Sequence, residues 1–118
     1  MEKDVLKVLD ILNEDNPYAT FLDQSTLSTV SDDDWIDTGS YILNGIISGK
    51  IKKGGIPMGR VTMLYGESQT LKSFLVQKTL ANAQKRGMTP VIFDTENAIE
   101  PEGAARLGLD TKKVKYIP

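Results

Sequence analysis

The alternation of apolar and polar positions predicts a regular succession of helices and strands from about residue 36 onward. Apolar residues recur at helical spacing in two stretches, and two short apolar runs of strand type are bounded by Gly or Pro. The predicted elements are, in chain order, a helix at 41–48 capped by Asp37 or Thr38, a turn at 56–59, a buried strand at 60–65, a helix at 72–86 with Val76, Leu80 and Ala83 facing inward, a buried strand at 90–94, a short helix from Pro101 to near Gly108, and a strand at 114–117.

This order of elements predicts an α/β fold with a parallel sheet. Strands that alternate with helices pair in parallel through right-handed crossovers. Sheets of this kind usually have more than three strands, and the last predicted strand is followed by no closing helix. We therefore expect the N-terminal portion of a larger protein.

The first 38 residues differ from the rest in charge. They carry ten acidic residues against two lysines, a net charge of −8, whereas residues 39–118 carry +6. Apolar residues at 5, 8, 9 and 12 predict an amphipathic helix over 2–14, followed by a polar segment at 15–37 with a β-prone stretch at 27–30. Two interpretations stay open: a solvated acidic extension, or an arm that docks on a basic surface of another copy.

Composition excludes several kinds of chemistry. The 118 residues contain no Cys and no His, which excludes disulfides, thiolate metal sites and Ser-His-Asp catalysis. No apolar run approaches the roughly 20 residues that span a bilayer, and the start is unlike a signal peptide. We therefore expect a soluble, cytoplasmic protein with no membrane partner.

The segment between the predicted strand at 60–65 and the helix at 72–86 has the composition of a phosphate-binding loop. In that position, backbone N–H groups and the helix N-terminus converge on an anion. Lys72 is expected to reach the β- and γ-phosphates of ATP, and the Ser73 hydroxyl to ligate Mg²⁺. The candidate nucleotide-binding residues of this loop are Gly66, Glu67, Ser68, Gln69, Thr70, Leu71, Lys72 and Ser73.

Leu71 departs from the usual phosphate-loop pattern, which has glycine at that position. A leucine fits if its φ is negative and its side chain points away from the nucleotide. The alternative is an ordinary strand–loop–helix turn. An extended segment, or one plugged by its own side chain, would count against ATP binding.

Two carboxylates follow the strand at 90–94. Ligands bind at the carboxyl ends of parallel strands, so Glu96 is expected to face the same crevice as the loop and to activate the water that attacks the γ-phosphate. Alternatively, Asp94 and Glu96 cap the following turn. A third interpretation, with Asp94 as the Mg²⁺ ligand of a Walker B strand, is less favoured because the strand comes only one crossover after the loop.

Taken together, these motifs resemble the RecA recombinase family from about Ile36 to Pro118. The most similar branch is the UvsX-type recombinases of T4-like phages, because of the run from Asn44 to Ser48-Gly49 and the bulky residue at the last loop glycine. The motifs that carry the resemblance are Thr38-Gly39-Ser40, Leu43-Asn44, Gly54-Gly55-Ile56-Pro57, Gly59-Arg60-Val61, Tyr65-Gly66, Phe93-Asp94-Thr95-Glu96 and Pro101.

The resemblance implies a partial RecA-like P-loop NTPase sheet at 36–118, preceded by an N-terminal oligomerisation arm and linker at 1–35. It also implies ATP and Mg²⁺ as cofactors, a homo-oligomeric filament on single-stranded DNA, and strand exchange in recombination and repair. By position, Glu96 and Lys72 correspond to catalytic residues, and Glu100 to an acidic residue near the adenine. Three residues depart from the family pattern: Leu71, Asn44 where aspartate is common, and Gly103 where many members have an aromatic residue.

The family's Walker B strand and DNA-binding loops would lie beyond residue 118. The loop strand would be separated from the next two by a missing strand, so we expect this portion alone to be weakly stable and inactive. The N-terminal helix packs on a neighbouring subunit in the family, whereas packing on its own core remains the alternative.

Other possible functions are a different RecA-core ATPase, of helicase or clock type, and a non-catalytic nucleotide-binding or oligomerisation module. If the protein is encoded by a phage, the host cytoplasm is the expected location.

Overall fold

The computed structural model of the chain describes residues 7, 8, 10–12, 14, 16, 21 and 30–118. Most of the predicted helix at 2–14 and of the β-prone stretch at 27–30 lies outside these residues. The described part of the first stretch, which includes Val8, Ile11 and Leu12, is helical. The elements are β1 (Trp35–Ile36), α2 (Tyr41–Ser48), β2 (Ile56–Pro57), α3 (Lys72–Lys85), β3 (Val91–Phe93), α4 (Pro101–Arg106), the 3₁₀ turn η2 (Thr111–Lys113) and β4 (Lys115–Ile117).

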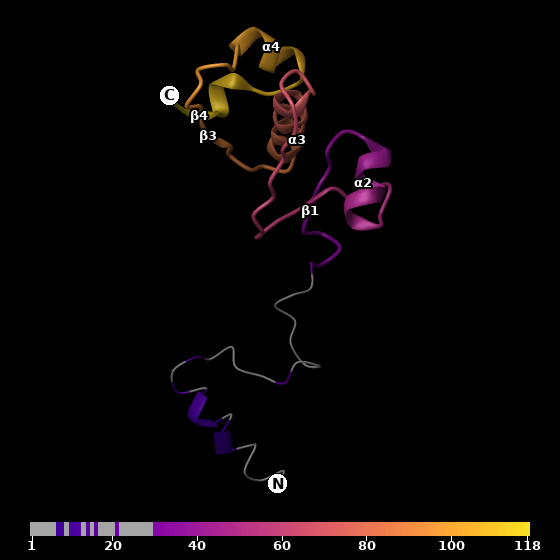
Figure 1. Cartoon of the computed structure of the whole chain (residues 1–118), viewed down its shortest axis with the longest axis vertical. Helices are drawn as coiled ribbons and strands as arrows, with labels where there is room; N and C mark the ends of the chain where they lie inside the picture. Colours follow the sequence, from indigo (N-terminus) through magenta and orange to yellow (C-terminus); the bar gives the residue numbers. More distant parts are fainter. Residues whose placement is uncertain (1–6, 9, 13, 15, 17–20, 22–29) are drawn as a thin grey trace.

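Helix α3 lies at the centre of the described structure. Figure 1 shows α4 and the β3–β4 pair on one side of α3, with β1 and α2 on the other. The core is formed by Ala81 of α3, Ala104 of α4 and Leu109, and Ile92 of β3 packs against it. Two of these three side chains are alanines, so the buried core is small.

The parallel pairing predicted from the element order is confirmed for the last two strands. β3 and β4 pair in parallel, with Val91 opposite Lys115 and Phe93 opposite Ile117. The Asp94 N–H extends the ladder to the Ile117 carbonyl at 2.9 Å. Parallel pairing brings the carboxyl ends of both strands to one edge of the sheet.

The prediction of a buried strand at 60–65 is wrong for this structure. The segment pairs with no other strand among the described residues, and Val61 is fully exposed. The run at 90–94 is also less buried than predicted, since Phe93 of β3 is 73% exposed. In the described part of the chain no strand pairs with 60–65, and β4 is the only strand that pairs with β3, so the exposed residues of both segments have no neighbouring strand to cover them.

Helix α2 has the predicted bounds but a different N-cap. The Ser40 side chain accepts from the Leu43 N–H at 3.3 Å, whereas either Asp37 or Thr38 was predicted to be the cap. The side chains of those two residues are used elsewhere, because the Asp37 carboxylate and the Thr38 hydroxyl both bind the buried Asn44 side chain. The cap therefore falls to the next polar residue.

The inner face of α3 is confirmed in part. Ala83 is buried and Leu80 packs against the core as expected, but Val76 is 42% exposed, and Ala81 and Asn82 are buried as well. The Asn82 side-chain amide donates to the Asp37 carbonyl at 3.0 Å. This contact orients α3 toward the segment before α2, which the apolar pattern alone does not reveal.

The two-stranded antiparallel pair β1–β2 depends on a glycine. Ile36 lies opposite Ile56, and Gly55 precedes this pair with φ +136°. A Cβ atom built on Gly55 would lie 1.9 Å from the Ile36 carbonyl oxygen, far inside van der Waals contact. Only glycine permits this close approach of the two backbones.

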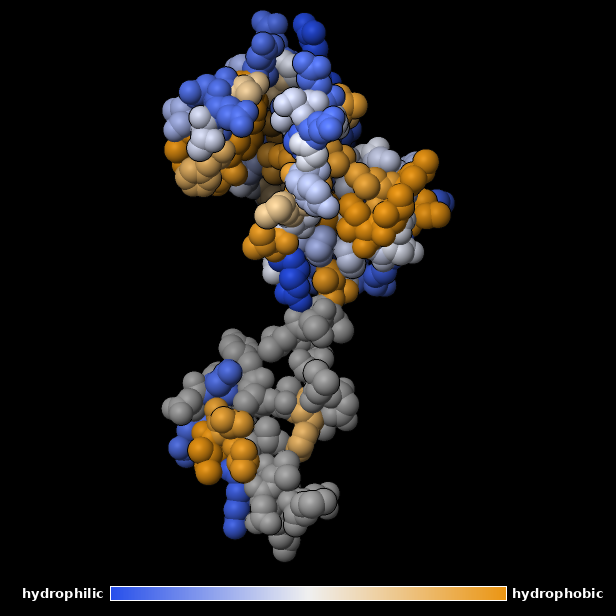
Figure 2. All heavy atoms as spheres, in the orientation of Figure 1, coloured by the Kyte–Doolittle hydropathy of each residue, from blue (hydrophilic) through white to orange (hydrophobic). Residues whose placement is uncertain are grey.

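Exposed apolar side chains gather over α2. Ile42 and Ile46 are 78% and 75% exposed, and Figure 2 shows an apolar surface at this place. Nothing in the described structure covers this surface. Within the described part of the chain, no helix has the length and apolarity needed to cross a membrane.

Candidate nucleotide-binding site

The segment from Gly66 to Ser73 turns back on itself between the extended residues 60–65 and α3. Gln69 and Leu71 both have left-handed backbone conformations, with φ of 64° and 63°. Two such residues close together fold the chain into a curl in front of the helix. The segment is therefore curled rather than extended, and the phosphate-loop interpretation requires this curled shape.

Leu71 does not have the negative φ that we expected for it. It is the N-cap of α3 with φ 63° and ψ 18°, a conformation that favours glycine because a Cβ atom is crowded there. The side chain is 70% exposed and lies outside the cavity described below, so its expected direction agrees with the structure. The loop thus adopts a glycine-type geometry with a leucine in it.

The Lys72 ammonium group lies over the start of the loop. It donates to the carbonyls of Gly66 at 3.0 Å and Glu67 at 2.5 Å, and lies 3.3 Å from the Thr70 hydroxyl oxygen. Its three hydrogens thus meet loop oxygens. The Lys72 side chain thus occupies the loop, which is the outcome that we expected to count against ATP binding. A phosphate has to replace some of these contacts rather than meet an unbound lysine.

The first turn of α3 is available to an anion. Leu71 as N-cap offers no side-chain hydrogen bond to the helix, unlike Ser40 in α2. The first-turn N–H groups of a 14-residue helix, together with its dipole, favour negative charge at this place. Ser73 lies in this turn, and its side chain is the candidate Mg²⁺ ligand.

A cavity of about 670 Å³ joins the loop to the carboxyl end of β3. This size falls in the range of about 300–1,000 Å³ that is usual for small-molecule sites. Its lining includes six of the residues predicted for the site, from both segments: Gly66, Ser68, Gln69, Lys72, Ser73 and Glu96.

The other predicted residues lie outside this lining. The Thr70 hydroxyl donates to the Glu67 carbonyl at 2.8 Å, so both residues stabilise the loop from within. Glu100 is the exposed N-cap of α4 and does not line the cavity. In α4, Gly103 has space beside it, since a Cβ atom there would come no closer than 3.9 Å to Glu100.

Asp94 caps the turn that follows β3, one of the interpretations left open by the sequence. Its carboxylate accepts from the Ile99 N–H and from the Tyr116 hydroxyl, each at 3.0 Å. Burial raises the pKa of Asp94, but these two hydrogen bonds and those from the Glu96 and Ala98 N–H groups outweigh burial, and the net pKa is below its usual value. Asp94 is thus a charged structural anchor next to Glu96.

Tyr116 is a residue near the site that the sequence did not reveal. It was predicted only as part of the last strand, but its hydroxyl reaches across to Asp94 on the neighbouring strand. The pKa of Tyr116 is raised, first by burial and then by the hydrogen bond and charge of Asp94. Only the strand register, Ile92 opposite Tyr116, makes this contact apparent.

No group of three or more His, Asp or Glu side chains that would hold a metal ion by itself occurs in the described ranges. The role of Ser73 as a Mg²⁺ ligand stays a prediction.

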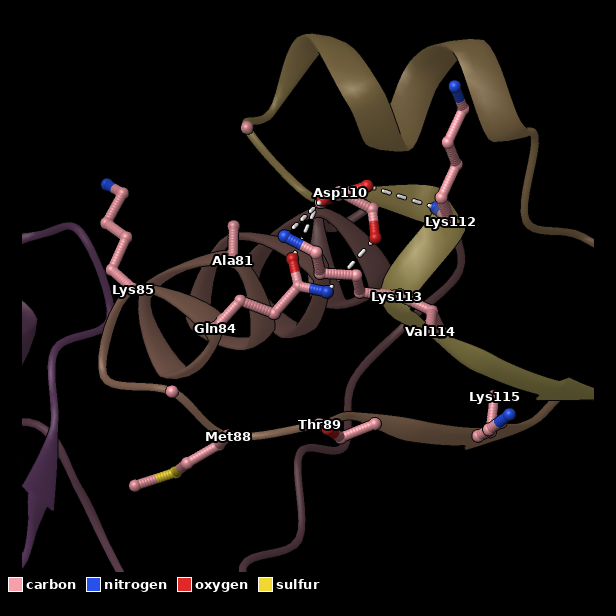
Figure 3. A pocket seen from close by; sticks show the side chains of 12 residues that line it. Ala81, Gln84, Lys85, Met88, Thr89, Asp110, Lys112, Lys113, Val114 and Lys115 are labelled. Carbon is pink, nitrogen blue, oxygen red and sulfur yellow. Dashed lines mark hydrogen bonds and ion pairs between the residues drawn. The ribbon is translucent and has the colours of Figure 1, made fainter.

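Several lysines line a second cavity of about 480 Å³, near the C-terminal end of α3 (Figure 3). Gln84 and Asp110 join its walls through two hydrogen bonds at 2.8 and 3.0 Å, and Lys113 pairs with Asp110 at 3.2 Å. The side chains of Lys85 and Lys112 lie at opposite sides of the view in Figure 3. The lysines thus share a hollow without converging on one point within it.

The described fold is that of a small α/β protein with a short parallel sheet and a strand-edge cavity next to a helix N-terminus. A family model described as the RecA N-terminal domain matches residues 20–116. The chain belongs to the RecA family.

Curated relatives agree with this assignment. The chain is 42% identical over 82 residues to Protein RecA of Aquifex aeolicus (strain VF5). The matched region is 70% of this chain and 22% of that protein. The chain is 43% identical over 82 residues to Protein RecA of Aquifex pyrophilus, and this match covers the same shares of the two chains. It is 40% identical over 76 residues to Protein RecA of an Arthrobacter species, and this match covers 64% of this chain and 20% of that protein. The chain thus spans about a fifth of the length of these relatives.

Proposed function

We propose that a protein containing this chain, together with the rest of the family's core, is an ATP-dependent DNA recombinase. It forms a homo-oligomeric filament on single-stranded DNA and promotes homologous pairing and strand exchange. The observation that carries the proposal is the cavity shared by Lys72, Ser73 and Glu96, in a chain of the RecA family. The relatives named above, each called Protein RecA, support the same proposal.

The residues of the loop fit a nucleoside triphosphate. The curl at Gln69 and Leu71 leaves the helix N-terminus open to an anion, and the Lys72 ammonium group already lies among loop oxygens. On binding, Lys72 would exchange contacts to the Gly66 and Glu67 carbonyls for phosphate oxygens, which carry more negative charge. Bound Mg²⁺, with the Ser73 hydroxyl as a ligand, would neutralise charge on the phosphates.

Glu96 is the candidate general base. It lines the same cavity from the turn after β3, where its carboxylate is able to accept a proton from a water molecule that attacks the terminal phosphate. Asp94, two residues earlier, is engaged with Ile99 and Tyr116, which leaves Glu96 as the carboxylate for this role. Glu100 contributes to adenine binding only if the turn between β3 and α4 changes position when the nucleotide binds.

The domain organisation is part of the proposal. Residues 1–35 form the oligomerisation arm and linker, and residues 36–118 form the first part of a RecA-like P-loop core. The fully exposed Val61 and the exposed Phe93 support a missing neighbouring strand at this sheet. The Walker B strand and the single-stranded DNA contacts belong to regions beyond residue 118, so the present residues alone are inactive as a recombinase.

We also propose a UvsX-type recombinase of a T4-like phage as the particular branch. Leu71 at the last loop position and the run from Asn44 to Ser48-Gly49 support it, although the relatives reported above are bacterial. A location in the cytoplasm, or in the host cytoplasm for a phage protein, follows from a role on DNA.

The test is hydrolysis of ATP by the intact protein, with and without single-stranded DNA, combined with a strand-exchange assay. We expect DNA to stimulate hydrolysis and strand exchange to require ATP, and Lys72→Ala to abolish both. Lys112→Ala is the matched control, because Lys112 is an exposed lysine that does not line the Lys72 cavity. DNA-stimulated hydrolysis without strand exchange favours another RecA-core ATPase. Failure of a nucleotide analogue to bind favours a non-catalytic module.

A further inference from the structure

The turn that carries Glu96 lies next to one side chain from β4. The Asn97 N–H donates to the Asp94 carbonyl at 3.3 Å, which closes a four-residue turn with Thr95 and Glu96 at its centre. The Tyr116 hydroxyl lies 3.0 Å from the Asp94 carboxylate and 3.5 Å from the Asn97 side-chain oxygen. Tyr116 therefore contacts the first and the last residue of the turn but not the two residues between them.

Strand geometry explains why Tyr116 reaches this turn. Tyr116 lies opposite Ile92 in the parallel pair, and side chains two apart on a strand share a face. Asp94 therefore lies on the same face as Ile92, one diagonal step from Tyr116. The Tyr116 side chain is long enough to span the diagonal distance to Asp94, and its hydroxyl lies at the carboxyl edge of the sheet.

The contact to Asp94 is the stronger of the two. A hydroxyl has one proton to donate, and a charged carboxylate at 3.0 Å takes it in preference to an amide oxygen at 3.5 Å. The bond is partly buried, since Asp94 is 8% exposed and Tyr116 is 44% exposed. The same carboxylate accepts from the Ile99 N–H at 3.0 Å, which fixes the exit from the turn as well as its start.

The turn itself has a conformation that needs such support. Asn97 is in the left-handed region with φ 51°, which a non-glycine residue adopts at a cost unless its surroundings hold it there. Thr95 and Glu96 are exposed, so packing does not fix them. The position of Glu96 at the cavity is therefore set by the hydrogen bonds at the two ends of the turn and by the bond from the Glu96 N–H to the Asp94 carboxylate.

We propose that Tyr116 is a positioning residue for Glu96: its hydroxyl, bound to Asp94 beside Asn97, holds the turn that presents the Glu96 carboxylate to the phosphate cavity. Tyr116 itself does not line that cavity and does not touch the nucleotide. This inference rests on the proposed function, because it assigns a role for Tyr116 in the hydrolysis attributed to Glu96.

Replacement of Tyr116 by Phe removes only the hydroxyl and keeps the ring. In the intact protein, we expect Tyr116→Phe to lower kcat for ATP hydrolysis about tenfold, because a small displacement of a general base is costly to the rate. We expect KM for ATP to stay within twofold, since the loop residues that bind phosphate are unchanged. Tyr41→Phe is the matched control, since Tyr41 is 66% exposed on α2, away from the site.

A second pair of variants separates positioning from general destabilisation. If Tyr116 acts through Glu96, Tyr116→Phe has no further effect on kcat once Glu96→Gln has removed the base. A purely structural role would lower kcat by the same factor in both backgrounds. The midpoint of thermal unfolding, measured for every variant, shows whether Tyr116→Phe remains folded at the assay temperature.

The outcomes are distinguishable. A tenfold loss of kcat in the wild-type background and none in the Glu96→Gln background supports the inference. An unchanged kcat for Tyr116→Phe, or equal losses in both backgrounds, overturns it and leaves the proposed function intact. A wild-type protein that binds and hydrolyses no ATP overturns the proposed function, and this inference with it.

Discussion

The side-chain amide of Asn44 donates a hydrogen bond to the carboxylate of Asp37, 2.7 Å away, at a position that is fully buried for Asn44. The amide oxygen of Asn44 accepts from the Thr38 N–H at 3.1 Å and from the Thr38 hydroxyl at 2.7 Å. Both ends of the amide are therefore used. An aspartate at 44 would face the Asp37 carboxylate with no hydrogen to donate, so the asparagine suits this position.

The first prediction concerns this pair. Asn44→Asp is expected to destabilise the protein by about 1–3 kcal/mol, since it buries a second carboxylate against the first and removes a hydrogen bond. Chemical denaturation measures the change. The swap Asp37→Asn with Asn44→Asp restores one donor and one acceptor across the pair, and we expect it to recover most of the loss. A swap no more stable than Asn44→Asp alone would show that the pair does not act as described.

A second prediction follows from the close approach of two backbones at Gly55. Gly55→Ala is expected to destabilise the protein by about 3 kcal/mol or more, because the new Cβ atom would lie 1.9 Å from the Ile36 carbonyl oxygen. Gly103→Ala is the matched control: its Cβ would have no neighbour closer than 3.9 Å, and alanine favours the helix. Thermal unfolding of the two variants compares them directly. Equal melting temperatures would contradict the steric argument.

Local patterns predicted the helices better than the strands. The bounds of α2 and the start of α4 at Pro101 follow from short-range signals, namely apolar spacing and a proline at the first turn. The strand predicted at 60–65 depends on a partner far away in sequence, and the described structure supplies none. Strand formation is a property of pairs, so a single apolar run overstates it.

The candidate site was predictable in part for a similar reason. Residues 66–73 carry a local motif, and the parallel order of elements brings the end of β3 to the same cavity, which now contains Glu96. The contact between Asp94 and Tyr116 required the strand register, and the N-cap at Ser40 required knowledge of where the Thr38 hydroxyl is used. The prediction of a negative φ at Leu71 was wrong, because the curl of the loop gives this residue a φ of 63° whatever its side chain.

Leu71 is the subject of the third prediction. Leu71→Gly is expected to stabilise the protein by about 0.5–1 kcal/mol, because relief of a left-handed conformation that costs about 1–2 kcal/mol exceeds the entropy lost by glycine. Leu71→Ala keeps the Cβ atom and serves as the control, with no stabilisation expected. Urea unfolding curves of the three proteins make the comparison. A Leu71→Gly variant less stable than Leu71→Ala would mean that the left-handed geometry is not adopted in solution.

The Asp94–Tyr116 hydrogen bond leads to a fourth prediction, on the dependence of stability on pH. The pKa of Asp94 is lowered in the folded protein, so its stabilising contribution is complete above the unfolded value of about 3.9 and is lost as pH falls through the folded value. The pKa of Tyr116 is raised, so its contribution is complete below about 10 and is lost as pH rises through the folded value.

Ultraviolet titration of tyrosine ionisation measures the alkaline part of this prediction. In Asp94→Asn, the Tyr116 hydroxyl loses its charged neighbour, and we expect its pKa to fall toward the ordinary value. Comparison with Tyr116→Phe identifies which transition belongs to this residue among the four tyrosines. Burial, the first cause of the raised pKa, remains in this variant, so we expect a partial fall. A transition that is unchanged by Asp94→Asn would contradict the contribution of Asp94.

The last prediction separates binding from hydrolysis at the candidate site. Glu96→Gln keeps the shape of the side chain at the cavity and removes its basicity, so the intact protein is expected to bind ATP as before and to hydrolyse it about 10²–10⁴-fold more slowly. Lys72→Ala, by contrast, removes a charge from the same cavity and is expected to weaken binding as well as hydrolysis. Fluorescent-nucleotide titration and steady-state hydrolysis distinguish the two variants. If Glu96→Gln hydrolyses ATP at the wild-type rate, the general base is a different residue. If both variants lose ATP binding to the same extent, Glu96 contacts the nucleotide in its ground state.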